Sequence, residues 1–184
     1  MDIQHIIAHF EQLSEEEQTK EIYAHYGLAL YFGQAAEQQV AHMLIFDKLF
    51  QVKPETGEQY TALFEEYAAA TKPAGLLAIE AQMAYQLADA DRDELQQVLM
   101  LREYLAGSYF KIHAALVLQP EGKRRLLSDF TAVQNRSRAL HARLQQYQRE
   151  YVERTGVEPE LMQQTWATVV RDAQRVLAAQ AGVA

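Results

Sequence analysis

The sequence predicts an all-α protein, a helical bundle of about six or seven helices, on the strength of three observations. Only four Pro and eight Gly occur among 184 residues, which leaves long uninterrupted stretches for helices. Apolar residues in these stretches recur every three or four positions, the period of one face of an α-helix. No segment shows the alternation that is typical of a strand. We therefore expect a single all-α domain over residues 1–184.

The first two helices are predicted near the amino terminus. Asp2 to Leu13 forms a short amphipathic helix with its Ile and Phe residues on one side. The sequence Ser14-Glu15-Glu16-Glu17 matches a capping box, so a second helix begins there and continues to about Phe50. Its packed face is expected to hold apolar and small residues: Ile22, Tyr26, Ala29, Gly33, Ala36, Val40 and Met43.

Two shorter helices, Glu58 to Ala70 and Leu76 to Leu87, precede a central helix from Glu94 to Leu118. Steps of three and four along the central helix predict one face with the following members: Leu95, Val98, Arg102, Leu105, Tyr109, Ile112 and Leu116. Arg102 lies in the middle of this apolar face. A buried guanidinium needs a carboxylate, a cavity or a ligand, and we expect a carboxylate partner, Glu37 of the second helix. The alternative is that Glu37 is exposed beside the packed face.

A long helix is predicted over 120–155, and a last one over 159–181. Positions at alternating steps of four and three give the long helix a coiled-coil-like seam: Leu126, Phe130, Val133, Ser137, Leu140, Leu144, Tyr147 and Tyr151. A seam of this kind can associate two copies of a chain, chiefly through Phe130, Val133, Leu140, Leu144 and Tyr147. We therefore expect a homodimer, formed through either the central helix or this long helix.

Charge and composition exclude several classes of function. The net charge is −8, with a balance of −9 in residues 1–70 and +4 in residues 120–154. An acidic chain is a poor general binder of nucleic acid, which leaves only the basic 120–154 helix for that role. We expect this helix to lie beside the acidic one instead. The amino terminus has no signal-peptide pattern, and no apolar run approaches membrane-spanning length, so we expect a cytoplasmic protein without membrane contact.

Motifs for ordinary catalysis are missing from the sequence. The absence of Cys excludes disulfides, thiolate metal sites and Cys nucleophiles. No Glu-x-x-His occurs, and His5 with His9 is the sole His pair at helical spacing, so no metal site is expected. Neither a phosphate-binding glycine loop nor a Gly-x-Ser-x-Gly elbow is present. No cofactor is indicated.

Three short blocks follow one another between about residues 20 and 118. They are Tyr26 to Tyr31 continuing to Gln34 and Glu37, then Phe64-Glu65 followed by Thr71 to Leu77, and then Leu101 to Phe110. In order and residue type they resemble an uncharacterised bacterial group of helical proteins related to the HEPN superfamily. The resemblance implies a HEPN-like core at 14–118.

The resemblance implies the motif of active HEPN ribonucleases, an Arg with a His four to six residues later. In those enzymes, two subunits bring these residues into a shared cleft. The His acts as acid and base in metal-free RNA cleavage, and the Arg stabilises phosphate charge. Arg102 matches this motif, but Glu103 and Gly107 stand where the resemblance implies an Asn and the His. His113 would lie about 16 Å from Arg102 along a continuous helix, too far to substitute within one subunit.

These residues leave three hypotheses. The first, which we favour, is a non-catalytic HEPN-like bundle that binds an unknown protein partner or a second copy of itself. The second is a metal-independent ribonuclease or nucleotide-binding protein with a rearranged site around Arg102, Tyr109 and His113. Arg136 and His141 have the Arg-to-His spacing of the ribonuclease motif, but they lie on the long helix, outside the matching blocks. The third is a purely structural coiled-coil-like scaffold.

Overall fold

The computed structural model describes residues 3–53, 58–59, 62–63, 65 and 72–156. By its internal contacts the chain divides into two units, Met1–Tyr147 and Gln148–Ala184. The account below concerns the first unit, apart from the described end of the second, where Thr155 Oγ1 donates to the Tyr151 carbonyl at 2.8 Å. The predicted helix at 159–181 and most of the one at Glu58 to Ala70 lie outside the described residues.

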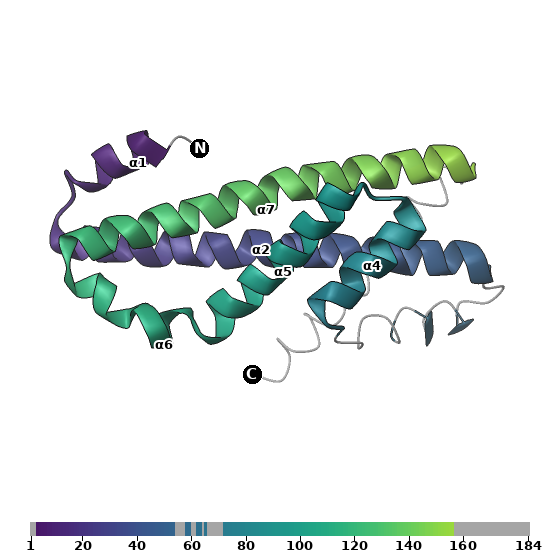
Figure 1. The fold of residues 1–184 in the computed structure, drawn as a ribbon, viewed down its shortest axis with the longest axis horizontal. Coiled ribbons are helices and arrows are strands. Elements are labelled where there is room, and N and C mark those ends of the chain that lie inside the picture. The colour runs from purple at the N-terminus through teal and green to yellow at the C-terminus, as the bar shows by residue number, and fades with distance from the viewer. Residues whose placement is uncertain (1–2, 54–57, 60–61, 64, 66–71, 157–184) are drawn as a thin grey trace, which may run out of the picture. The chain divides into compact units, whose positions relative to one another are not determined.

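The described residues form helices and no strand, which confirms the all-α prediction (Figure 1). In chain order the elements are α1 (Ile3–Phe10), α2 (Glu15–Val52), α4 (Ala74–Tyr85), α5 (Asp89–Gly107), α6 (Tyr109–His113), the 3-10 helix η1 (Ala114–Leu118) and α7 (Pro120–Thr155). The boundary between the two units falls within α7.

The capping box at Ser14 is present as predicted. Ser14 Oγ accepts from the Glu17 backbone N–H at 3.4 Å, and the Ser14 N–H donates to Glu17 Oε2 at 2.9 Å. The Ser14 hydroxyl also donates to Glu17 Oε2 at 2.6 Å, and this bond, together with the one from the Ser14 N–H, lowers the pKa of the Glu17 carboxyl. The capping box satisfies two of the donors that a helix start leaves unpaired. The packed face of α2 is also as expected: Ile22, Ala29, Gly33, Ala36, Val40 and Met43 are buried, with Tyr26 half-buried.

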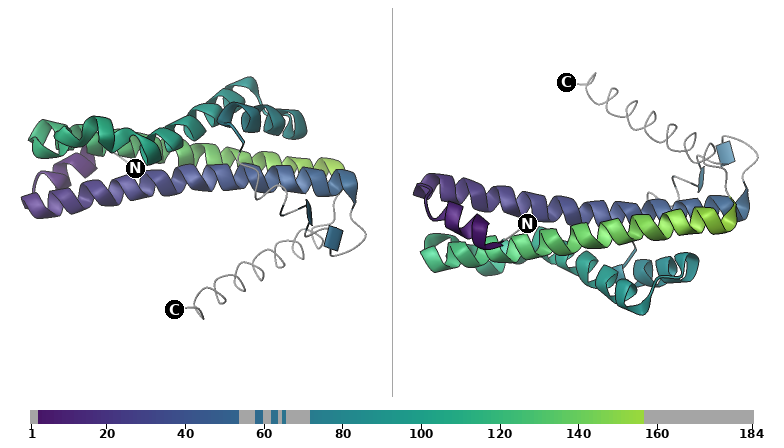
Figure 2. Two further views of the ribbon diagram at one scale, coloured as in Figure 1. Left: turned by 90° about the horizontal axis from the view of Figure 1, so that it is seen from below. Right: turned by 90° about the horizontal axis from the view of Figure 1, so that it is seen from above.

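Helix α5 packs against α2 and contacts α7 through the pair of Glu94 with Arg136. It crosses both helices obliquely and in the opposite chain direction (Figure 1). The Tyr26 hydroxyl of α2 donates to the Leu105 carbonyl of α5 at 2.8 Å. Figures 1 and 2 show α2 and the first part of α7 side by side and parallel in every view. Helix α4 covers α5 and the later part of α2. The core near the start of α2 is apolar and aromatic: Phe10, Ile22, Ala29, Leu105, Tyr109, Leu126, Leu127, Phe130 and Val133.

A buried polar layer lies between α2 and α7. His25 is 6% exposed, Thr131 1% and Gln134 1%. Gln134 Nε2 donates to the His25 carbonyl at 2.8 Å and lies 3.2 Å from His25 Nδ1. Thr131 Oγ1 lies 3.3 Å from the same ring nitrogen. This His is therefore a hydrogen-bonded core residue rather than a surface group.

The prediction of one continuous central helix is wrong. Helix α5 ends at Gly107, Ser108 adopts φ −134° and ψ −21°, and a short α6 and η1 follow. Glycine is a weak helix former, and Gly/Ser pairs are frequent sites of helix kinks, which gives the break its local cause. The predicted face holds at Leu95, Val98, Leu105 and Tyr109, which are buried. It fails after Tyr109, the first residue of α6, because Ile112 is 65% exposed.

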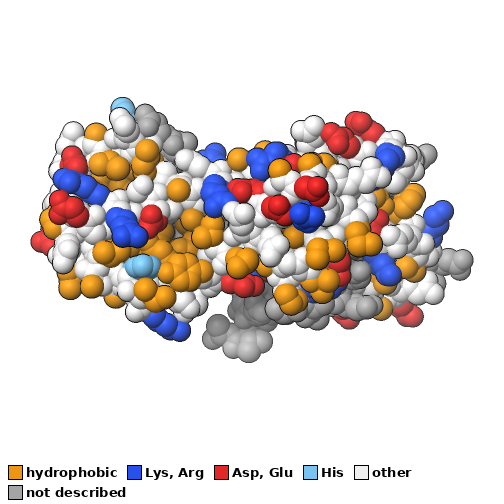
Figure 3. Space-filling model, in the orientation of Figure 1, with side chains coloured by type: hydrophobic (Ala, Val, Ile, Leu, Met, Phe, Trp, Pro, Cys, Tyr) orange, Lys and Arg blue, Asp and Glu red, His pale blue; other side chains and the backbone are white. Residues whose placement is uncertain are grey.

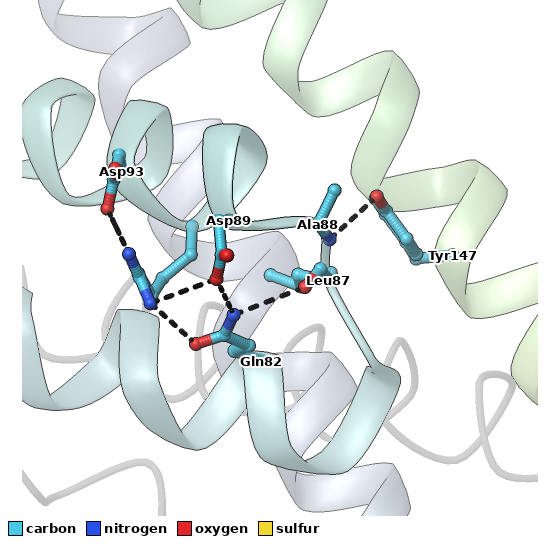
Figure 4. A network of polar contacts seen from close by, with 7 residues as sticks. Gln82, Leu87, Ala88, Asp89, Asp93 and Tyr147 are labelled. Atoms are coloured by element: carbon cyan, nitrogen blue, oxygen red, sulfur yellow. Dashed lines mark hydrogen bonds and ion pairs between the residues drawn. The ribbon is translucent and has the colours of Figure 1, made fainter.

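The long helix is present, and the apolar seam in its first part is buried within its own chain. Leu126, Phe130, Ser137, Leu140 and Leu144 are 0% exposed, and Val133 is 9% exposed. Tyr147, the last seam position in the first unit, joins the network between α4 and α5 (Figure 4). Its hydroxyl accepts from the Ala88 N–H at 3.1 Å and donates to Asp91 Oδ2 at 2.8 Å. A second copy could reach these seam residues only by displacing helices of this chain.

The basic side chains of α7 are largely neutralised within the chain. Lys123 pairs with Glu15, Arg124 with Glu11, Arg136 with Glu94 and Arg143 with Asp91. Arg125 makes a long contact of 3.9 Å with Asp129, which leaves both charges weakly compensated. Arg138 stacks on the Phe32 ring, with its guanidinium carbon 5.1 Å from the ring centroid. This ion pairing joins α7 to Glu11 and Glu15 of the acidic segment 1–70, and to Asp91 and Glu94 of α5. It leaves little uncompensated positive charge between Pro120 and Tyr147 for phosphates.

Candidate functional site

Arg102 and Glu37 form a salt bridge between α5 and α2, through Arg102 Nη2 and Glu37 Oε2. Their side chains are 23% and 32% exposed, so the pair lies at the edge of the helix interface. Gly33 makes the close approach possible. A Cβ at this position would lie 2.8 Å from Arg102 Cγ and 2.9 Å from Arg102 Cβ, closer than real side chains pack. The Arg102 guanidinium is therefore held by Glu37 on the face of α5 that packs against α2.

Replacing Arg102 by Ala is expected to lower the free energy of unfolding by about 1–2 kcal/mol, less than for a fully buried pair because water reaches both groups. Urea denaturation followed by circular dichroism measures the change. The exposed pair of Lys20 with Glu16, whose side chains are 72% and 79% exposed, supplies a matched control. Lys20→Ala is expected to cost less than about 0.5 kcal/mol. Equal stability of Arg102→Ala and wild type would show that the pair has no structural role.

The break after Gly107 creates a pocket where α5, α6 and α7 meet. Its volume is about 280 Å³. Its walls are formed by Leu101, Tyr104, Leu105, Tyr109, His113, Asp129, Ala132, Val133 and Arg136. Figure 3 shows hydrophobic side chains gathered on this face, over the region between α6 and α7. The lining combines a mainly apolar floor with phenol, imidazole, carboxylate and guanidinium groups.

Two hydrogen bonds hold the aromatic side chains of the pocket. The Tyr104 hydroxyl lies 2.8 Å from His113 Nε2, across the break between α5 and α6. The Tyr109 hydroxyl donates to Asp129 Oδ2 at 3.0 Å and so joins α6 to α7. Burial and the bond to Asp129 raise the pKa of Tyr109 well above its ordinary value. The Tyr109 phenol therefore stays protonated near neutral pH and acts as a donor.

Arg136 borders the pocket with its charge already compensated. Its Nε and Nη2 donate to the two carboxylate oxygens of Glu94 at 3.0 and 2.8 Å, and Nη2 also donates to Gln97 Oε1 at 2.8 Å. The bond from Arg136 lowers the pKa of Glu94, so this bidentate pair stays ionised at neutral pH. His141, which follows Arg136 at motif spacing, instead contacts Gln145 with its Nε2 at 3.0 Å.

The predicted site residues thus separate into two groups. Tyr109 and His113 line one pocket, whereas Arg102 is not part of its lining. Gly107 is exposed at the end of α5, and no atom lies within 4 Å of the point where a Cβ would be. Sequence reasoning misses Tyr104 and Asp129, because neither carries a motif. The Gly107-Ser108 dipeptide is the one sequence signal that could have placed Tyr104 beside His113.

Other features of a functional site are absent from the described residues. These residues contain no group of three or more His, Asp or Glu placed to hold a metal ion. Within the described part of the chain, no helix is both long enough and apolar enough to cross a membrane. In comparisons with family models, with curated proteins and with solved structures, nothing matches this chain.

Proposed function

We propose that this chain is a non-catalytic, HEPN-like helical bundle that acts in the cytoplasm by self-association, as a homodimer formed through the exposed face of α4. The observation that carries the proposal is that α4 is apolar on both sides. A helix that is hydrophobic all round is normally covered all round. A homodimer would cover the second side.

One side of α4 packs inside the chain, through Ala74, Leu77, Ala78, Ala81 and Tyr85. Its other side presents Leu76, Ile79 and Met83, which are 45%, 51% and 80% exposed. Steps of three and four place these three side chains in one stripe. Exposed apolar side chains in a continuous row are characteristic of interaction surfaces on soluble proteins, whereas isolated ones are not.

The chemistry of this stripe suits a second copy of the same helix. Glu80, the acidic residue of α4, pairs with Lys72 at 2.7 Å, so its charge is compensated inside the chain. Two antiparallel copies of α4 related by a twofold axis would place Leu76 of one copy near Met83 of the other, with Ile79 near the axis. Apolar side chains would then meet apolar side chains, without an unpaired charge in the contact.

Replacing Met83 by Glu is expected to convert the dimer to monomer, because the contact would then bury two carboxylates that lose their hydration and find no partner. Light scattering coupled to size-exclusion chromatography measures the mass, and thermal unfolding checks that the fold remains. Leu118→Glu is the matched control, since Leu118 is 83% exposed but lies on η1. A monomeric wild type, or a Met83→Glu dimer of unchanged affinity, would contradict the proposal.

The proposed absence of catalysis has its own test. Arg102 is paired with Glu37 and does not line the pocket that holds His113. Labelled single-stranded RNA is therefore expected to stay intact with wild type and with Arg102→Ala in EDTA, as judged by gel electrophoresis. Cleavage by wild type that disappears in Arg102→Ala would instead establish a metal-independent ribonuclease with a rearranged site.

A further inference from the structure

We propose that the pocket between α5, α6 and α7 is a binding site for a small organic cation with a flat aromatic body. This inference is independent of self-association through α4. It rests on three features of the pocket: aromatic walls held in place by hydrogen bonds, one carboxylate with an available oxygen, and a volume suited to a single-ring molecule.

The aromatic walls come from α5 and α6. The rings of Tyr104 and Tyr109 meet edge to face, with centroids 5.6 Å apart and an interplanar angle of 74°. The His113 ring lies 4.7 Å from the Tyr109 ring. The bonds from Tyr104 to His113 and from Tyr109 to Asp129 fix the hydroxyl ends of both phenols. A ligand therefore meets rings that are already ordered, which lowers the entropic cost of binding. Phenol faces attract both flat rings and cations.

The charge left uncompensated at this pocket is negative. Among the residues of the lining, Arg136 carries the positive charge, and Glu94 neutralises it. Asp129 makes its two contacts through Oδ2, with the Tyr109 hydroxyl at 3.0 Å and with Arg125 Nε at 3.9 Å. The Arg125 side chain is 66% exposed, so this long ion pair is weak. Oδ1 of Asp129 remains available to accept hydrogen bonds from a ligand cation.

The volume is sufficient for one ring and a short charged group. A pocket of about 280 Å³ has the volume of roughly nine water molecules. Leu101, Leu105 and Val133 supply apolar contact for the ring. Benzamidine fits this description, since it joins one phenyl ring to a planar cation that can donate two parallel hydrogen bonds to a carboxylate. It serves here as a probe of the class.

The test compares benzamidine with benzamide and benzoate, which have the same shape but are neutral and anionic. Each is titrated into the full-length protein, and binding is followed by ¹⁵N chemical-shift changes. We expect benzamidine to bind with a Kd of about 1 mM or tighter, and benzamide and benzoate to bind at least about tenfold more weakly. Equal binding of all three, tighter binding of benzoate, or no benzamidine binding up to about 10 mM would overturn the proposal.

Three variants locate the site. Asp129→Asn is expected to weaken benzamidine binding about tenfold while leaving benzamide binding unchanged. Glu103→Gln removes an exposed carboxylate of α5 outside the lining and is expected to change neither. Ala132→Phe fills the pocket from an exposed position of α7 and is expected to abolish binding without a loss of stability. Undiminished benzamidine binding by either Asp129→Asn or Ala132→Phe would place the ligand elsewhere and refute the site.

Discussion

Replacing Leu140 by Ala is expected to lower the free energy of unfolding by about 2–5 kcal/mol and to leave the oligomeric mass unchanged. Leu140 is 0% exposed within the single chain, so its truncation leaves a cavity in this chain's own core. A residue that served an interface between copies would instead change the mass at constant stability. Urea denaturation gives the free energy, and light scattering on the same samples gives the mass.

Leu118→Ala is the control for this experiment, because Leu118 is 83% exposed and its truncation is expected to cost less than about 0.5 kcal/mol. If Leu140→Ala dissociated the dimer at unchanged stability, the seam of α7 would be the interface between two copies, as its heptad pattern suggests. Together with Met83→Glu, the measurement distinguishes residues that stabilise the fold of one chain from residues that stabilise the dimer.

Gly122→Ala is expected to destabilise the protein by about 1–3 kcal/mol, although alanine is the better helix former. A Cβ at Gly122 would lie 2.2 Å from the carbonyl oxygen of Leu116 and 2.7 Å from its Cα. These are backbone atoms of η1 and cannot rotate aside as a side chain does. The substitution therefore forces η1 away from the first turn of α7, and thermal unfolding measures the cost.

Gly107→Ala provides the opposite case for comparison. No atom lies within 4 Å of a Cβ at Gly107, which ends α5, so we expect unchanged stability or a gain of about 0.5–1 kcal/mol. If Gly122→Ala were as stable as Gly107→Ala, η1 would move away from α7 without a loss in the free energy of unfolding. The close packing of η1 on α7 would then contribute nothing to stability.

The parts of the fold that depend on local signals are predictable from the sequence. The start of α2 follows from the capping box at Ser14, whose two hydrogen bonds join residues three apart. The packed face of α2 follows from helical periodicity, because burial of one face needs the same spacing whatever the neighbour. The salt bridge of Glu37 with Arg102 follows from the cost of burying a charge between apolar residues.

Features that depend on small energy differences or on the choice of partner are not predictable in this way. Ending a helix at Gly107 rather than continuing through it is decided by roughly 1 kcal/mol, which tertiary contacts readily supply. The pocket follows from that break, since it brings His113 back to Tyr104. A heptad pattern also indicates that a face is covered without indicating by which chain. The pattern therefore assigns Leu140 to a dimer seam, although this residue packs inside its own chain.

The polar layer of His25, Thr131 and Gln134 fixes the axial position of α7 along α2. Two parallel helices with repeating apolar faces can slide by one turn, about 5.4 Å, and still bury similar surfaces. Such a shift would take Gln134 Nε2 away from the His25 carbonyl, now 2.8 Å distant, and leave buried donors without acceptors. Each loss costs about 1–3 kcal/mol. The layer therefore sets the register of the two helices. It adds little to the free energy of their packing, but it selects one of several alignments that the apolar residues alone would tolerate.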